Sequence, residues 1–153
     1  MSDRERYSYA YKLVRFNSCT KAFESLFVPR KAVHSYAVGK WTGARFGGLL
    51  VFKSAKDVRK FVHDNSLSLV NDYKAGRLKL LRVACRKRIE LPCARISCSS
   101  TIAFDSPAWL EALWGNKVRK WYSVDTIDGW PKGTSAYKEV RPIREVKCKF
   151  DLS

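Results

Sequence analysis

The stretch YAVGKWTGARFGGLLVFKSAKDVRKFV, residues 36–62, carries the signals that decide the fold. Its β-forming start is broken by a glycine-rich loop over residues 39–48, and the apolar run of residues 49–52 has the length of a short buried strand. Ser54 is placed to cap a helix, with Asp57 at the acidic position of a capping box. The stretch therefore predicts strand, loop, strand and helix, and the helix has apolar residues at helical spacing: Ala55, Val58, Phe61 and Val62.

One segment before this stretch and one after it have side chains of different kinds at alternate positions, as half-buried strands do. Residues 7–16 place tyrosines on one face and Ala10 and Lys12 on the other. Residues 78–87 place Val83 and Cys85 on one face and arginines on the other. Both segments are therefore predicted to be strands. Shorter strands are expected at residues 32–38, 117–124, 136–140 and 145–150.

The remaining segments read as helix or turn. Pro107 follows a capping pair and begins a predicted helix over residues 107–114, which ends at Gly115. Residues 20–27 fit a short helix, but residues 25–28 equally fit an edge strand, and both alternatives stay open. Polar exits, turns and irregular segments are expected at residues 64–68, 71–76, 91–100 and 128–134.

These elements add up to about six or seven strands and two short helices, without a regular alternation of strand and helix. The order predicts an α+β fold with a mostly antiparallel sheet. The chain has 153 residues and 46% hydrophobic content, which suit one compact domain. We expect a frayed N-terminus over residues 1–6 and a single domain over residues 7–153.

The charge is the unusual feature of the composition. Thirty Lys and Arg against 14 Asp and Glu leave a net charge of +16, which an acidic partner would neutralise. Nucleic acid, a membrane surface and acidic proteins are the candidate partners, and basic residues beside aromatic ones favour contact with phosphates and bases. The predicted contact residues form two groups along the chain: Arg77, Lys79, Arg82, Arg86, Lys87 and Arg88, and then Lys117, Arg119 and Lys120.

The glycine-rich loop of residues 39–48 does not match a phosphate-binding P-loop. A P-loop ends in Gly-Lys-Ser/Thr and opens a helix, whereas this loop runs into a strand. We expect the loop to present a contact surface made of Trp41, Arg45 and Phe46.

Catalytic and metal-binding patterns are absent from the sequence. Cys93 and Cys98 are the nearest cysteine pair, and their spacing is poor for zinc. His34 and His63 accompany no recognisable nucleophile motif, and the available acids form no set: Asp57, Asp125, Asp128 and Glu139. The prediction is no catalytic residue, no metal, no cofactor and no small-molecule substrate.

The location follows from the N-terminus and the cysteines. The first residues lack the apolar core of a signal peptide, and the longest apolar run has the four residues 49–52, so we expect no membrane span. Five cysteines without such a signal suggest a reducing compartment. The predicted location is therefore a reducing compartment and not the secreted fraction.

Four segments together resemble a family of small uncharacterised proteins of phages and large DNA viruses: YKLV, YAVGKWT, GGLLVFKSAKDVRKFV and KGTSAYKEVRPIREV. The resemblance implies a common α+β fold and a viral origin, with a location in a virion or in the cytoplasm or nucleus of a host cell. It supplies no catalytic residues. The strong basicity and the five tryptophans depart from the family's pattern.

Three functions compete on these grounds. The first is a non-enzymatic structural or interaction protein, a minor virion or capsid component that contacts acidic proteins or the packaged genome. The second is a nonspecific nucleic-acid-binding protein, which acts through phosphate contacts. The third, less favoured, is a small ADP-ribosyltransferase-like or nuclease enzyme, whose site would be assembled only in space.

Overall fold

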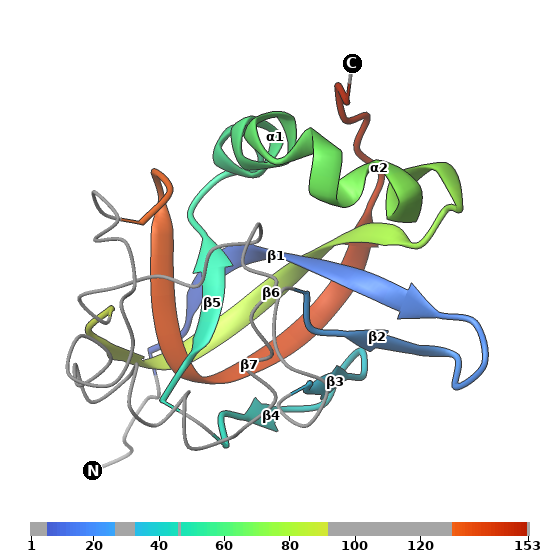
Figure 1. Cartoon of the computed structure of the whole chain (residues 1–153). Coiled ribbons are helices and arrows are strands. Elements are labelled where there is room, and N and C mark those ends of the chain that lie inside the picture. The colour runs from blue at the N-terminus through green and yellow to red at the C-terminus, as the bar shows by residue number, and fades with distance from the viewer. Residues whose placement is uncertain (1–5, 27–32, 46, 92–129, 153) are drawn as a thin grey trace, which may run out of the picture.

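The computed structural model describes residues 6–26, 33–45, 47–91 and 130–152, which form an antiparallel sheet with two helices on one side (Figure 1). The predicted α+β class is confirmed. The described strands are β1 (Ser8–Asn17), β2 (Ala22–Glu24), β3 (Ser35–Tyr36), β4 (Thr42–Gly43), β5 (Leu49–Phe52), β6 (Leu78–Ile89) and β7 (Thr134–Val146). The described helices are α1 (Ala55–Asp64) and α2 (Ser66–Lys74).

Four of the strands pair in a closed ring. β1 pairs with β6, β6 with β7 and β7 with β5, and β5 returns to β1 where Phe52 lies opposite Tyr11. The two longest strands, β6 and β7, have 12 and 13 residues and bend strongly (Figure 1). The ring is a small barrel, and each of its strands therefore has an inward and an outward face.

The three short strands extend this ring at its edges. β2 pairs with the end of β1, β3 pairs with β2, and β4 pairs with β7. Phe23 lies opposite Phe16 in the β1–β2 ladder. The short helix predicted for residues 20–27 is therefore wrong, because residues 22–24 are paired as a strand. This strand also ends before the alternative edge strand of residues 25–28, whose described residues, Ser25 and Leu26, are not in a strand.

Two apolar cores lie on opposite sides of the strands. The inward faces of the ring enclose the first, and the second lies between the outward face and the helices. Leu13 and Leu80, which face each other across β1 and β6, belong to the second core. The helices therefore cover the outward face at the row of these leucines. The helical residues of the second core are Val58, Val62 and Leu69, which are fully buried.

The predicted cap of α1 is confirmed. The backbone N–H of Asp57 donates to Ser54 Oγ at 3.1 Å, and the Ser54 hydroxyl donates to Asp57 Oδ2 at 2.8 Å. Gly133, just before β7, has a φ of +82° and packs against the Asp57 side chain. A Cβ at this position would collide with the carboxylate. The cap is therefore fixed both by its own hydrogen bonds and by the turn before β7.

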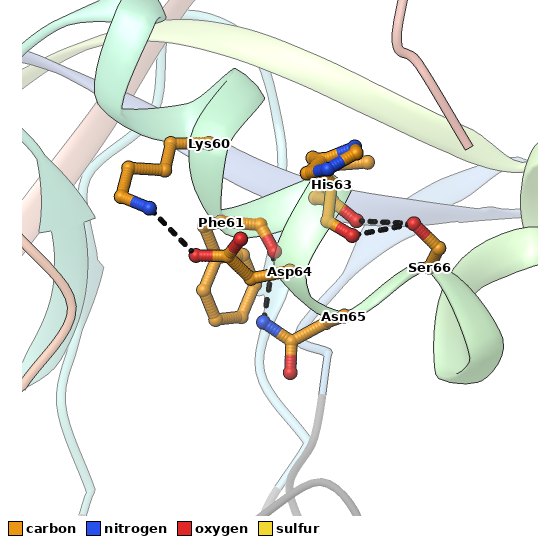
Figure 2. Close-up of polar contacts among 7 residues, drawn as sticks. Lys60, Phe61, His63, Asp64, Asn65 and Ser66 are labelled. Carbon is orange, nitrogen blue, oxygen red and sulfur yellow. Dashed lines mark hydrogen bonds and ion pairs between the residues drawn. The ribbon is translucent and has the colours of Figure 1, made fainter. Parts of the chain in front are cut away.

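The polar exit and turn predicted for residues 64–68 and 71–76 are wrong, because α2 occupies most of this segment. Asn65 Nδ2 donates to the carbonyl of Phe61 at 2.8 Å and Ser66 Oγ to that of His63 at 2.5 Å, so polar side chains satisfy the end of α1 (Figure 2). α2 then begins immediately and buries Leu69. Its stability comes from this packing, which outweighs a weakly helical sequence.

The two final strands predicted at residues 136–140 and 145–150 are one continuous strand, β7, and residues 147–150 are not part of it. Pro142 lies inside β7 opposite Val83, while Arg144 lies opposite Arg82, so Ile143 is an extra residue on this strand. A bulge of this kind accommodates a proline, because the local ladder is already interrupted. The Pro142 carbonyl accepts a hydrogen bond from the Gly39 N–H, at 2.8 Å.

Several predictions lie outside the described residues. They are the helix of residues 107–114, the strand of residues 117–124 and nearly all of the irregular segment 91–100. The turn predicted for residues 128–134 is present in its described part, where Lys132 and Gly133 form it. No helix within the described ranges has the length and apolar content needed to cross a membrane.

Candidate functional site

Beyond the row of leucines that the helices cover, the outward face of β1, β6 and β7 carries tyrosines and arginines. In the next row Tyr11 lies opposite Arg82, which lies opposite Arg144. In the row after that, Tyr9 lies opposite Ala84, which lies opposite Arg141. We call this surface the tyrosine–arginine face. It comprises Tyr9, Tyr11, Arg82, Ala84, Arg141 and Arg144, the next pair Arg86 and Glu139, and Tyr7, whose ring contacts Arg141.

Trp41 stands at the edge of this face, immediately before β4. The Arg86 guanidinium carbon lies 3.9 Å from the centre of the Trp41 ring, and that of Arg141 lies 4.9 Å from it. The Tyr7 ring lies 5.3 Å from the Trp41 ring and 5.5 Å from the Arg141 guanidinium. Cations at these distances are attracted to the ring faces, so Trp41 holds two arginines of the face in place.

A second aromatic contact lies further along the face. The Arg82 guanidinium carbon lies 4.7 Å from the centre of the Tyr11 ring and 5.7 Å from that of Tyr9. Tyr11 also packs against the core below the helices, whereas Tyr9 is 54% exposed. Tyr9 is therefore the ring of this face that is most open to solvent.

The face carries a net positive charge. Glu139 accepts from Arg86 Nε and lies 3.5 Å from Lys87 Nζ, and the hydrogen bond from Arg86 lowers the pKa of Glu139. In the part of the chain that the structure describes, no carboxylate pairs with the three other arginines of the face. These unpaired cations are Arg82, Arg141 and Arg144.

The basic cluster predicted along residues 77–88 is divided by the fold. Arg82 and Arg86 join the tyrosine–arginine face. Arg77 Nε instead lies 2.8 Å from Asp72 Oδ1, and Lys79 Nζ lies 3.4 Å from Glu145 Oε1. These two basic residues are therefore partly neutralised at the opposite end of β6, away from the Trp41 contacts.

Lys87 and Arg88 lie near the end of β6, where Arg88 still pairs with Tyr137 of β7. Lys87 has a φ of +61°, in the left-handed region that disfavours a residue with a Cβ. Arg88 is exposed and lines an open groove with Thr134, Ser135 and the end of β6. Arg88 therefore lies beyond the rows that make up the tyrosine–arginine face, next to this groove.

Of the two described residues of the predicted contact loop, Trp41 reaches the face and Arg45 does not. Arg45 Nη2 donates to the carbonyl of Val33 at 2.6 Å, and the Arg45 N–H donates to His34 Nε2 at 3.1 Å. These bonds hold the guanidinium against the segment before β3. Phe46 and the second predicted basic group, Lys117, Arg119 and Lys120, lie outside the described residues.

Sequence reasoning missed five residues of the face as contact residues: Tyr7, Tyr9, Tyr11, Arg141 and Arg144. The alternation of residues 7–16 places the tyrosines on one face of a strand but gives no reason for that face to point outward. Arg141 and Arg144 flank Pro142, and the expected break between two strands there hid their common partner, β6. The available signal was the matching alternation of tyrosines at residues 7–11 and arginines at residues 82–86.

The inward face of the barrel contains a buried lysine. Lys12 is 7% exposed, its Nζ donates to the carbonyl of Leu50 at 2.7 Å, and it lies 5.1 Å from the centre of the Tyr36 ring. Burial lowers the pKa of Lys12 to about 8. Burial also raises the pKa of Cys85 to about 12 and raises that of Tyr36. This group lies within the barrel and does not contribute to the outer surface.

The acids considered for catalysis have structural partners where they are described. Asp57 accepts from the hydroxyl of the capping Ser54, and Glu139 binds Arg86 and Lys87. Asp125 and Asp128 lie outside the described residues. Among the residues that are described, no three or more His, Cys, Asp or Glu side chains gather as a metal site would require.

Comparison with known proteins leaves the site to be interpreted from its own geometry. No family model, curated protein or solved structure matches the chain. The interpretation therefore rests on the charge, exposure and contacts of the tyrosine–arginine face.

Proposed function

We propose that the protein is a non-enzymatic nucleic-acid-binding protein that holds its partner without sequence specificity, through the phosphates. One observation carries this proposal: unpaired arginines and an exposed tyrosine occupy the same outward sheet face. Arg82, Arg141 and Arg144 offer guanidinium groups to phosphate oxygens. A surface of this composition suits a polyanion better than it suits a neutral partner.

The overall charge supports the same function. The net charge of +16 attracts a polyanion from a distance, and the face provides the contacts at short range. Trp41 orders two arginine side chains in the unbound protein, because its ring contacts the guanidinium groups of Arg86 and Arg141. Side chains that are already ordered lose less conformational entropy when they bind.

The dependence of binding on salt tests this function. We expect the logarithm of the affinity for a labelled oligonucleotide to fall linearly with the logarithm of the salt concentration. Replacing Arg82 and Arg144 by glutamine should weaken binding at low salt by about ten-fold and make the slope shallower by about one or two contacts. Fluorescence anisotropy over a series of salt concentrations measures both quantities.

A matched control removes the same charge elsewhere. Lys56 and Arg59 are exposed on α1, and their replacement by glutamine should leave the slope nearly unchanged. If both double variants lose the same affinity for the oligonucleotide, binding depends on net charge alone and the tyrosine–arginine face is not the binding site. Absence of binding by the unchanged protein at low salt would exclude the function.

A role in a viral particle is the second candidate, and exposed apolar residues favour it. Val38 and Ile143 are 53% and 39% exposed and flank the hydrogen bond between Gly39 and Pro142. Apolar residues beside a basic surface suit a protein contact in an assembly, as the resemblance to viral proteins implies. Detection of the protein in purified particles would support this role, and its restriction to the lysate of infected cells would contradict it.

A further inference from the structure

We propose that the tyrosine–arginine face takes single-stranded nucleic acid, with Tyr9 as the ring on which a base stacks. This inference rests on the proposed function and narrows its substrate class. Tyr9 is 54% exposed and lies on β1, at the edge of the row that it forms with Ala84 of β6 and Arg141 of β7. A base in a single strand is free to stack on such a ring, whereas the bases of a duplex already stack on one another.

The surroundings of Tyr9 fit a base followed by its phosphate. The Arg82 guanidinium lies 5.7 Å from the Tyr9 ring centre, and Arg141 lies across the fully buried Ala84 in the same row. Since Ala84 does not rise above its neighbours, the ring and both guanidiniums form one continuous surface. A strand that crosses this surface meets an aromatic platform with two guanidiniums beside it, on the side of β6 and β7.

The other aromatic residues of the face are less suited to stacking. The ring of Trp41 already contacts Arg86, Arg141 and Tyr7. Tyr11 packs partly into the core below the helices and carries Arg82 at 4.7 Å. Trp41 is therefore a positioning residue for the arginines, and Tyr9 alone among these rings has the exposure that a base platform needs.

An acidic polypeptide is the competing occupant of the face. Its carboxylates would bind the same arginines, but it has no flat bases for the Tyr9 ring. The two occupants therefore differ in how they respond to loss of the ring. A duplex also differs from a single strand in this response, because it contacts the face through its phosphates and not through a base stacked on Tyr9.

The experiment compares three labelled probes by fluorescence anisotropy at one low salt concentration. The probes are an oligothymidine of about 15 nucleotides, a duplex of the same length and a polyglutamate peptide. Replacing Tyr9 by leucine keeps an apolar side chain but removes the ring, and it should weaken binding of the single strand by about ten-fold. Binding of the duplex should stay within about two-fold, since its contacts are to phosphate.

Tyr9→Phe is the control, because it keeps the ring and removes only the hydroxyl. It should bind the single strand within about two-fold of the unchanged protein, which separates stacking from any loss of fold. Equal single-strand affinities for the leucine and phenylalanine variants would overturn the inference, as would polyglutamate binding as tight as that of the single strand. If both nucleic acids bind but Tyr9→Leu leaves binding of the single strand unchanged, the inference fails and the proposed function stands. If neither nucleic acid binds, both fail.

Discussion

At the scale of the residue, Lys12 shows how far burial alters an ordinary side chain. Its ammonium group lies inside the barrel with a carbonyl and an aromatic ring as partners. The pKa of about 8, against 10.5 for the free side chain, means that the folded protein releases this proton more readily than the unfolded chain. Below pH 8 both states are protonated, and the cost of burying the charge is roughly 3 kcal/mol.

This difference predicts how stability changes with pH. Between pH 8 and 10.5 the folded protein is deprotonated at Lys12 and the unfolded chain is not, so this residue makes stability rise with pH. The Lys12→Met variant lacks this rise. The free energy of unfolding of the variant minus that of the unchanged protein should therefore fall by about 1 kcal/mol from pH 7 to pH 9. Urea denaturation at three pH values measures the change.

The raised pKa values of Cys85 and Tyr36 act in the opposite direction in alkaline solution, since the unfolded chain ionises first. They are present in both proteins, so the difference between variant and unchanged protein isolates Lys12. Lys56→Met on the exposed face of α1 serves as the control, and its difference should be constant with pH. A constant difference for Lys12→Met would contradict the assignment.

At the scale of the element, the start of α1 joins local sequence to tertiary packing. Ser54 satisfies a backbone N–H of the first turn, and Gly133 holds the turn before β7 against Asp57. Ser54→Ala should lower the free energy of unfolding by about 1 kcal/mol, because the N–H of Asp57 loses its acceptor. Thermal and urea unfolding measure the loss.

Ser68→Ala is the matched control, because Ser68 is exposed within α2. Alanine is the better helix former there, so this variant should be as stable as the unchanged protein or slightly more stable. Equal losses in the two serine variants would show that the cap contributes nothing beyond helix propensity.

At the scale of the whole molecule, the excess of positive charge opposes folding. With 30 basic and 14 acidic residues, the compact state repels itself more than the expanded chain does. Added sodium chloride should therefore raise the melting temperature while it weakens binding of nucleic acid over the same range. Scanning calorimetry and anisotropy in one salt series test the two opposite trends, and a melting temperature that falls with salt would contradict the first.

The sequence by itself determined the local elements, because their causes lie within a few residues. The LLVF run of residues 49–52, the Ser54 cap and the alternation of residues 78–87 all appear in the structure as the patterns predict. Alternation also grouped the arginines of β6 correctly, since side chains of a strand point to opposite faces in turn. What it left open was the direction in which each face points.

Tertiary structure alone decided that direction and the partners of each residue. Closure of the ring turned Lys12 inward and the tyrosines outward, although lysine is seldom buried. The bulge at Ile143 kept β7 continuous through Pro142 and so brought Arg141 and Arg144 beside β6. Pairing across residues far apart in the chain depends on register and packing, which short-range patterns do not contain.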